Sequence, residues 1–190
     1  HHNILPTLKR QLDPELLFSA SVADEHGIAV LQHHDMIIHS AAHLFLEGEF
    51  DSGLRDLSDL HLLLSTLSSP QDWQGLVTRA QQLGLLYPVY LACRYSQKIY
   101  HTDVPPGSFK ADHLATDIPR GWRLRVLDTL FNRVLVPHHP SCEGIGFKLS
   151  SFVLYVRGHL LKMPLRILLP HLLKKTLRPK EQDESQQTMM

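Results

Sequence analysis

Apolar residues recur with a helical period along most of the chain. They do so between residues 35 and 47, and leucines form one stripe between 52 and 67. Gly48 directly follows the first segment, and glycine often ends a helix because it adopts the left-handed conformation without strain. The pattern predicts a helix over 35–47 that ends at Gly48, and a second helix over 52–67.

A third helix is marked by its first residues. Ser69, Pro70 and Asp72 provide a side-chain cap, a proline in the first turn and an acidic group near the positive helix end. These signals predict a helix over 70–83, with Gly84 as its stop.

The later segments continue the helical pattern with interruptions. We expect a helix that opens near Pro88 and runs to residue 100, a break over 103–108, a helix over 120–136 and a loop over 136–146. Further along, Pro164 and Pro170 interrupt one or two helices, because proline removes a backbone donor.

The first 31 residues are less regular. Asp13 and Pro14 predict the start of a short helix, and the segment after Gly27 has an extended pattern. Together with the later helices, this predicts a mostly-α fold. It would be a bundle of short antiparallel helices with a short strand remnant near the N-terminus.

Charge is unevenly spread, although the net charge is zero. Residues 144–180 hold eight Lys/Arg and no Asp or Glu, whereas residues 1–143 hold 11 basic and 16 acidic side chains. We expect an acidic body and a basic C-terminal arm, followed by a disordered polar tail over 181–190. Zero net charge and an arm with few aromatic residues argue against nucleic acid as a partner.

Cysteines and apolar stretches indicate the compartment. Cys93 and Cys142 lie too far apart in sequence for a metal or redox motif. The first residues contain no signal-peptide core, and no apolar stretch is long enough for a transmembrane helix. We expect a cytoplasmic protein, with peripheral contact to a membrane as an alternative.

The densest candidate chemistry is a group of four histidines and an aspartate between residues 33 and 43. His39 and His43 are four apart, which is the spacing of two helical zinc ligands, but no glutamate lies between them. His34 and Asp35 also form the HD pair of metal phosphohydrolases, which would need Asp59 or His61 as a further ligand.

The alternative for these histidines is ordinary helix packing, and it is the one we favour. His33 and His34 would lie at the start of the helix beside Asp35 as a capping aspartate. His39 and His43 would face inward or half inward and form hydrogen bonds to neighbouring helices.

The segment LRDLSDLHLLL contains a second group of polar residues. Arg55 and Asp59 are four apart and can pair along one helix face, with Asp56 on an adjacent face. Such a pair can be a solvated surface feature of small energetic effect. It can also line a cleft with His43 of the preceding helix.

Four segments, taken in order, resemble a known family. They are HHNILP, DMIIHSAAHLF, LRDLSDLHLLL and DWQGLVTRAQQLGL. Together they resemble the C-terminal helical part of an uncharacterised bacterial nucleotidyltransferase family, often called nucleotidyltransferase family 5, of the polymerase-β-like superfamily. The resemblance covers about residues 1–106 and, more loosely, 154–164.

The resemblance implies a catalytic domain that precedes these helices. In such domains a Gly-Ser turn, an Asp-x-Asp strand and a third carboxylate hold divalent metal at the nucleoside triphosphate. This chain has no such motif, because no matching acids follow Gly107 and Ser108. We expect the chain to be inactive alone and to need its N-terminal catalytic domain, Mg²⁺, an NTP and a small or lipid-linked acceptor.

The same resemblance assigns parts and candidate residues. Residues 1–31 would be the edge of the catalytic domain, 32–140 a helical domain and 141–180 the basic helical arm. By analogy, the cleft would be faced by His43, Arg55, Asp56, Asp59 and Arg79. Arg55 would suit a phosphate through paired hydrogen bonds.

The basic arm alternates basic and apolar residues. Its candidates for contact with anionic lipid or another anion are Arg157, Lys162, Arg166, Lys174 and Lys175. The alternative is a helix that packs on the body, with its positive charge toward the acidic part. The prolines favour the packed arrangement, because they prevent one long helix from lying on a membrane.

Overall fold

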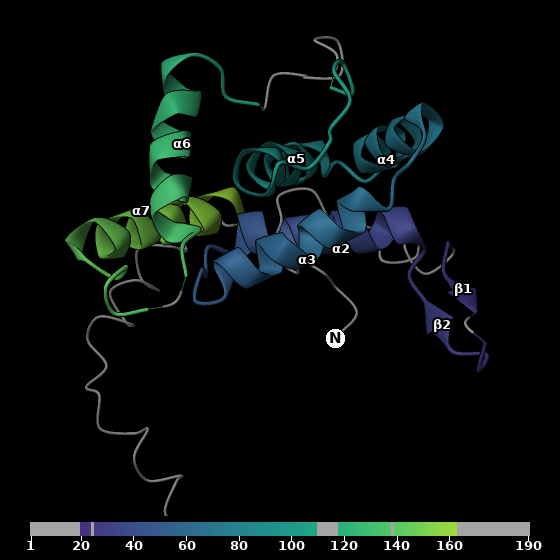
Figure 1. Ribbon diagram of the computed structural model, residues 1–190, viewed down its shortest axis with the longest axis horizontal. Helices are drawn as coiled ribbons and strands as arrows, with labels where there is room; N and C mark the ends of the chain where they lie inside the picture. The colour runs from purple at the N-terminus through teal and green to yellow at the C-terminus, as the bar shows by residue number, and fades with distance from the viewer. Residues whose placement is uncertain (1–19, 24, 110–117, 138, 163–190) are drawn as a thin grey trace, which may run out of the picture.

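The computed structural model describes residues 20–23, 25–109, 118–137 and 139–162 (Figure 1). These parts contain six helices and one antiparallel pair of strands. The elements are β1 (Val22–Ala23), β2 (Ala29–Val30), α2 (His33–Glu47), α3 (Gly53–Ser65), α4 (Pro70–Gln82), α5 (Leu86–Tyr100), α6 (Trp122–Val134) and α7 (Ile145–Lys162). The predicted mostly-α fold, with short strands near the front of the chain, is confirmed.

Helix α2 is the centre of the bundle. It contacts α3, α4, α5 and α7, and eight of its residues are buried. Its apolar side chains point to several sides, so α2 packs on four neighbours at once. Ala41 and Ala42 are fully buried, and their small side chains leave room for adjacent helices.

An aromatic cluster joins α2, α5 and α6. Phe45 lies 5.9 Å from Tyr95 and 5.3 Å from Phe131, measured between ring centroids. Phe50, in the turn after α2, meets the edge of Phe131 at 5.8 Å. Each such pair contributes about 0.5–1.5 kcal/mol beyond the apolar area it buries.

The helix ends show which local signals the fold uses. Gly48 ends α2 in the left-handed conformation, with φ of 81°, as predicted. Ser69 and Asp72 form a reciprocal capping box at α4, also as predicted. The capping role of Asp35 is wrong: α2 begins at His33, and its N-cap, Gln32, makes no side-chain cap.

Two glycines allow α7 to approach the end of α2 closely. A Cβ atom on Gly48 would lie 2.9 Å from the Tyr155 Cα, and one on Gly158 would lie 3.0 Å from the Leu46 carbonyl oxygen. Any side chain at either position would therefore push the two backbones apart. Gly48 thus both ends α2 and admits α7.

Several predictions fall outside the described residues. These are the short helix at Asp13 and Pro14, the tail over 181–190, and the arm side chains of Lys162, Arg166, Lys174 and Lys175.

Candidate functional site

The most buried charged pair links α2 to α4. Arg79 donates from Nε to Asp35 Oδ1 at 2.8 Å and from Nη2 to Asp35 Oδ2 at 2.9 Å. The Asp35 side chain is fully buried and that of Arg79 is 16% exposed. This bidentate bond raises the pKa of Arg79. Arg79, predicted to face a cleft, is therefore held inside the bundle near the start of α2.

The first two histidines of α2 serve packing, as the favoured interpretation predicted. His33 Nε2 lies 3.2 Å from the Leu63 carbonyl oxygen and 2.6 Å from Thr66 Oγ1, both on the α3 side. The His34 ring covers Gly75 of α4, where an added Cβ would lie 2.8 Å from His34 Cε1. Burial lowers the pKa of His34, so its ring favours the neutral form.

The other two histidines differ in exposure. His43 is exposed, and its Nε2 lies 3.1 Å from Glu47 Oε2 on the same helix. The expectation that His43 faces inward or half inward is therefore wrong. His39 is half-buried, and burial, followed by the nearby His43, lowers its pKa.

His43 and the polar residues of α3 lie on adjoining outward faces. The contact of His33 with Leu63 sets the antiparallel register of α2 and α3. His43 lies ten residues after His33, and in an antiparallel pair this position is level with the first turn of α3, ten residues before Leu63. That turn carries Arg55 and Asp56. His43, Arg55 and Asp59 are exposed and Asp56 is half-buried, and we call these four residues of the two adjoining helices the α2–α3 polar face. Arg79 is not part of it.

The Arg55 side chain is 78% exposed. Its Nε lies 3.9 Å from Asp56 Oδ1, in place of the predicted pair with Asp59. A loose, exposed pair of this kind constrains the guanidinium little, so Arg55 can turn to an incoming anion.

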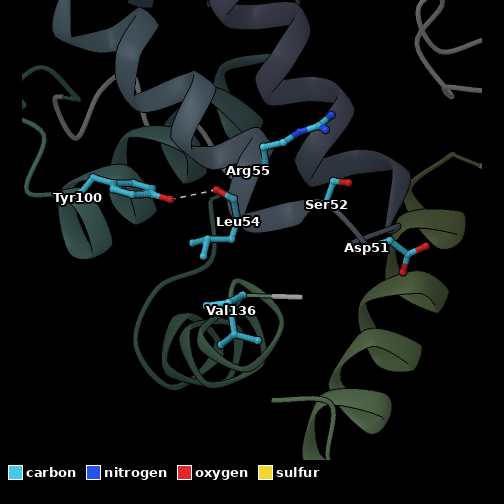
Figure 2. Close-up of a pocket in the computed structure, with 7 residues that line it drawn as sticks. Asp51, Ser52, Leu54, Arg55, Tyr100 and Val136 are labelled. Carbon is cyan, nitrogen blue, oxygen red and sulfur yellow. Dashed lines mark hydrogen bonds between the residues drawn. The ribbon is translucent and has the colours of Figure 1, made fainter. Parts of the chain in front are cut away.

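A hollow of about 390 Å³ lies beside the start of α3. It is lined by Asp51, Ser52, Leu54, Arg55, Tyr100, Val136 and Pro137. The Tyr100 hydroxyl donates to the Leu54 carbonyl oxygen at 3.1 Å, and Figure 2 shows the Arg55 side chain extending away from Leu54 and Val136. Arg55 thus lines the hollow, but its guanidinium is directed away from the apolar side chains of Leu54 and Val136.

The residues present do not form a metal site of the expected kind. Within the ranges that the structure describes, no three His, Cys, Asp or Glu side chains converge as a metal group. His34 and Asp35, the HD dipeptide, are both committed to helix packing. His61 stacks on Tyr100 and lies 2.8 Å from Thr102 Oγ1.

A polar network between α5 and α6 was not predicted from the sequence. Arg94 donates to Asp128 from Nε at 2.9 Å and from Nη2 at 2.6 Å, and the Tyr95 hydroxyl donates to the same carboxylate at 3.1 Å. The hydrogen bond from Arg94 lowers the pKa of Asp128, and burial raises that of Tyr95. These residues are far apart in sequence, and no local pattern links them.

Arg157 points into the body. Its Nη1 donates to the Phe45 carbonyl oxygen at 3.3 Å and its Nη2 to the Tyr87 hydroxyl at 2.5 Å. The guanidinium also lies over the rings of Tyr87 and Phe131. Arg157, predicted to meet an outside anion, instead fixes α7 to α2, α5 and α6.

Comparison with known proteins identifies the family. The family described as "Uncharacterised nucleotidyltransferase" matches residues 1–101. The chain belongs to this family. No curated protein and no solved structure gives a match. The match includes α2 to α5, and therefore the whole α2–α3 polar face.

Proposed function

We propose that this chain is the helical, substrate-side part of a nucleotidyltransferase that moves a nucleotidyl group from an NTP to an acceptor. Family membership, which spans α2 to α5, carries the proposal. The α2–α3 polar face supports it, because an exposed arginine, two aspartates and a histidine there have no role in the core. In this proposal the face closes on the nucleotide or the acceptor.

Each side chain of the face suits a binding role. Arg55 would hold a phosphate by two parallel hydrogen bonds, which its planar guanidinium favours. Asp56 and Asp59 would accept hydrogen bonds from hydroxyl groups of a ribose or of a sugar acceptor. The acceptor would be a small or lipid-linked compound, as in surface-polysaccharide synthesis.

The metal would be held elsewhere. Asp56 and Asp59 are carboxylates three positions apart, but the described residues bring no third ligand to them. They do not fit the site that holds Mg²⁺ in polymerase-β-like enzymes, and we assign them no step through a metal. The metal-binding carboxylates would belong to a catalytic domain outside these 190 residues.

A transfer assay tests the proposal. The assayed polypeptide would contain a catalytic domain with the Gly-Ser and Asp-x-Asp motif, followed by this chain. It would receive labelled NTP and an extract that contains acceptor molecules. The Arg55→Ala variant lacks the guanidinium that would bind the phosphate, so its kcat/KM should be roughly 10- to 100-fold lower. The Asp59→Asn variant should also be impaired.

Matched controls separate binding from folding. Arg125 is also an exposed arginine, but it lies on α6 away from the face, and Arg125→Ala should keep full activity. Thermal unfolding should be nearly the same for both arginine variants, because exposed ion pairs contribute little. Full activity of both Arg55→Ala and Asp59→Asn would refute the role of the polar face.

A second candidate function has its own observation. The helical part could act without catalysis by contacting a membrane surface, and the exposed face of α7 favours such contact. This contact is compatible with the first proposal, because lipid-linked acceptors lie at membranes.

A further inference from the structure

The outward face of α7 is apolar along its length. Its exposed apolar side chains are Ile145 (87%), Leu149 (59%), Phe152 (59%), Val153 (40%), Leu160 (37%) and Leu161 (37%). A helical period puts all of them except Leu161 on one side of α7, and we call these five residues the α7 stripe. The opposite side, with Leu154 and Gly158, packs on the body.

The α7 stripe differs from the outward face of α3. On α3 the exposed positions carry Arg55, Asp59, Leu62 and Ser65, so one exposed leucine lies among polar residues. Scattered single apolar residues are normal on a protein surface, whereas a contiguous stripe marks an interaction site. We therefore expect the α7 stripe to be an interaction site.

Charge indicates what covers it. Lys148 is exposed within the first turn of α7, one position before Leu149. From residue 144 to residue 180 the chain has eight Lys/Arg and no Asp or Glu. An apolar stripe in a segment with only positive charge matches a helix that lies in the plane of an anionic lipid surface.

The place of α7 in the fold agrees with this occupant. Figure 1 shows α7 and the β1–β2 hairpin at opposite sides of the molecule. The described segment that directly precedes α2 is this hairpin, so it lies far from the stripe. After α7, residues 163–180 continue with the same mixture of leucine, lysine and arginine.

We propose that α7 docks on an anionic lipid surface. The α7 stripe enters the boundary between headgroups and acyl chains, while the exposed Lys148 in the first turn of α7 meets the lipid phosphates. Arg157 takes no part, because its guanidinium is bonded inside the body.

Co-sedimentation with vesicles tests this inference. The 190-residue chain is mixed with vesicles of phosphatidylcholine, alone or with added phosphatidylglycerol. It should bind the anionic vesicles and lose binding as salt rises. The double variant Leu149→Asp and Phe152→Asp should lower the partition coefficient roughly tenfold or more, because two apolar side chains leave the lipid.

Two controls show that the effect belongs to the stripe. Leu62 is 61% exposed on α3, so Leu62→Asp introduces the same chemistry elsewhere and should bind like the unmodified chain. Lys148→Glu changes no apolar residue and should weaken binding several-fold only at low salt. It also provides a test should the double variant fail to fold.

Three results would overturn the proposal. One is equal binding to neutral and anionic vesicles or to neither. Another is unchanged binding of the folded double variant. The third is a chain that is dimeric in solution, becomes monomeric in the double variant and ignores vesicles, which would make the stripe an interface between two copies.

Discussion

Helices α3 and α7 both pack on α2, yet they present opposite surfaces to solvent. Outward positions of α3 carry mainly polar side chains, and its buried leucines face the core. Outward positions of α7 carry isoleucine, leucine, phenylalanine and valine, while an arginine, Arg157, points inward. An apolar outer face such as that of α7 is typical of a helix that contacts a partner, whereas the polar outer face of α3 is typical of a helix exposed to water.

The comparison also separates two kinds of polar residue. On the α2–α3 polar face, Arg55 and His43 make loose, exposed pairs. Inside the bundle, Arg79, Arg94 and Arg157 make short bonds that connect helices. We therefore expect the inner arginines to control stability and the outer one to control binding.

The largest loss of stability is expected at the inner pair of α2 and α4. Arg79→Met leaves the Asp35 carboxylate buried without its guanidinium, which destabilises the fold by about 3–5 kcal/mol. The double variant Asp35→Leu with Arg79→Met removes the buried charge and should recover most of that loss. Urea unfolding at neutral pH measures both. A decrease of less than about 1 kcal/mol in the free energy of unfolding of Arg79→Met would show that this pair has no such structural role.

A smaller loss is expected between α5 and α6. Asp128→Asn weakens the bonds from Arg94 and Tyr95 and should destabilise the protein by about 1–3 kcal/mol at neutral pH. Because the folded pKa of Asp128 is lowered, its contribution is present above the unfolded carboxyl pKa of about 3.9 and is lost as pH falls through the folded pKa. The difference between the two proteins should therefore shrink in acid. A constant difference from neutral pH into acid would contradict this account.

The smallest of these effects concerns the joint of α2 and α7. In Gly158→Ala the new Cβ meets the Leu46 carbonyl at 3.0 Å, which should cost about 1–2 kcal/mol after the gain in helix propensity. Gly146 is the matched control within α7, since a Cβ there lies 3.8 Å from Arg133 Cδ. Gly146→Ala should be neutral or stabilising by up to about 1 kcal/mol. Thermal unfolding compares Gly158→Ala with Gly146→Ala. Equal changes in stability would contradict the claim that the close contact of α7 with α2 requires glycine at position 158.

Local signals in the sequence predict much of this fold. Gly48 and the Ser69–Asp72 pair define helix ends through bonds and backbone angles within a few residues. Such signals act without knowledge of the rest of the chain, so they can be found from sequence. The predicted helices therefore match the observed ones to within a few residues at their ends.

Long-range pairing could not be predicted in the same way. Asp35 resembled a capping residue at the start of a helix, and its partner, Arg79, lies 44 positions away. The inward direction of Arg157 was missed because α7 is apolar on both sides, so its period does not reveal the buried face. The small residue Gly158, next to Arg157, was the one local hint of close packing.

Five residues were expected to face one cleft. Four of them belong to the α2–α3 polar face, because their helical spacing and the short turn between the two helices bring them near one another. Arg79 does not, since a buried carboxylate binds it. Whether the face binds substrate remains a prediction.

The coding DNA immediately upstream of His1 tests the central claim most directly. If this chain is the substrate-side part of a nucleotidyltransferase, the same reading frame should continue upstream into a Gly-Ser turn followed by Asp-x-Asp. A start codon with a ribosome-binding site directly before His1 would contradict the claim, because the chain would then lack the carboxylates that the chemistry needs.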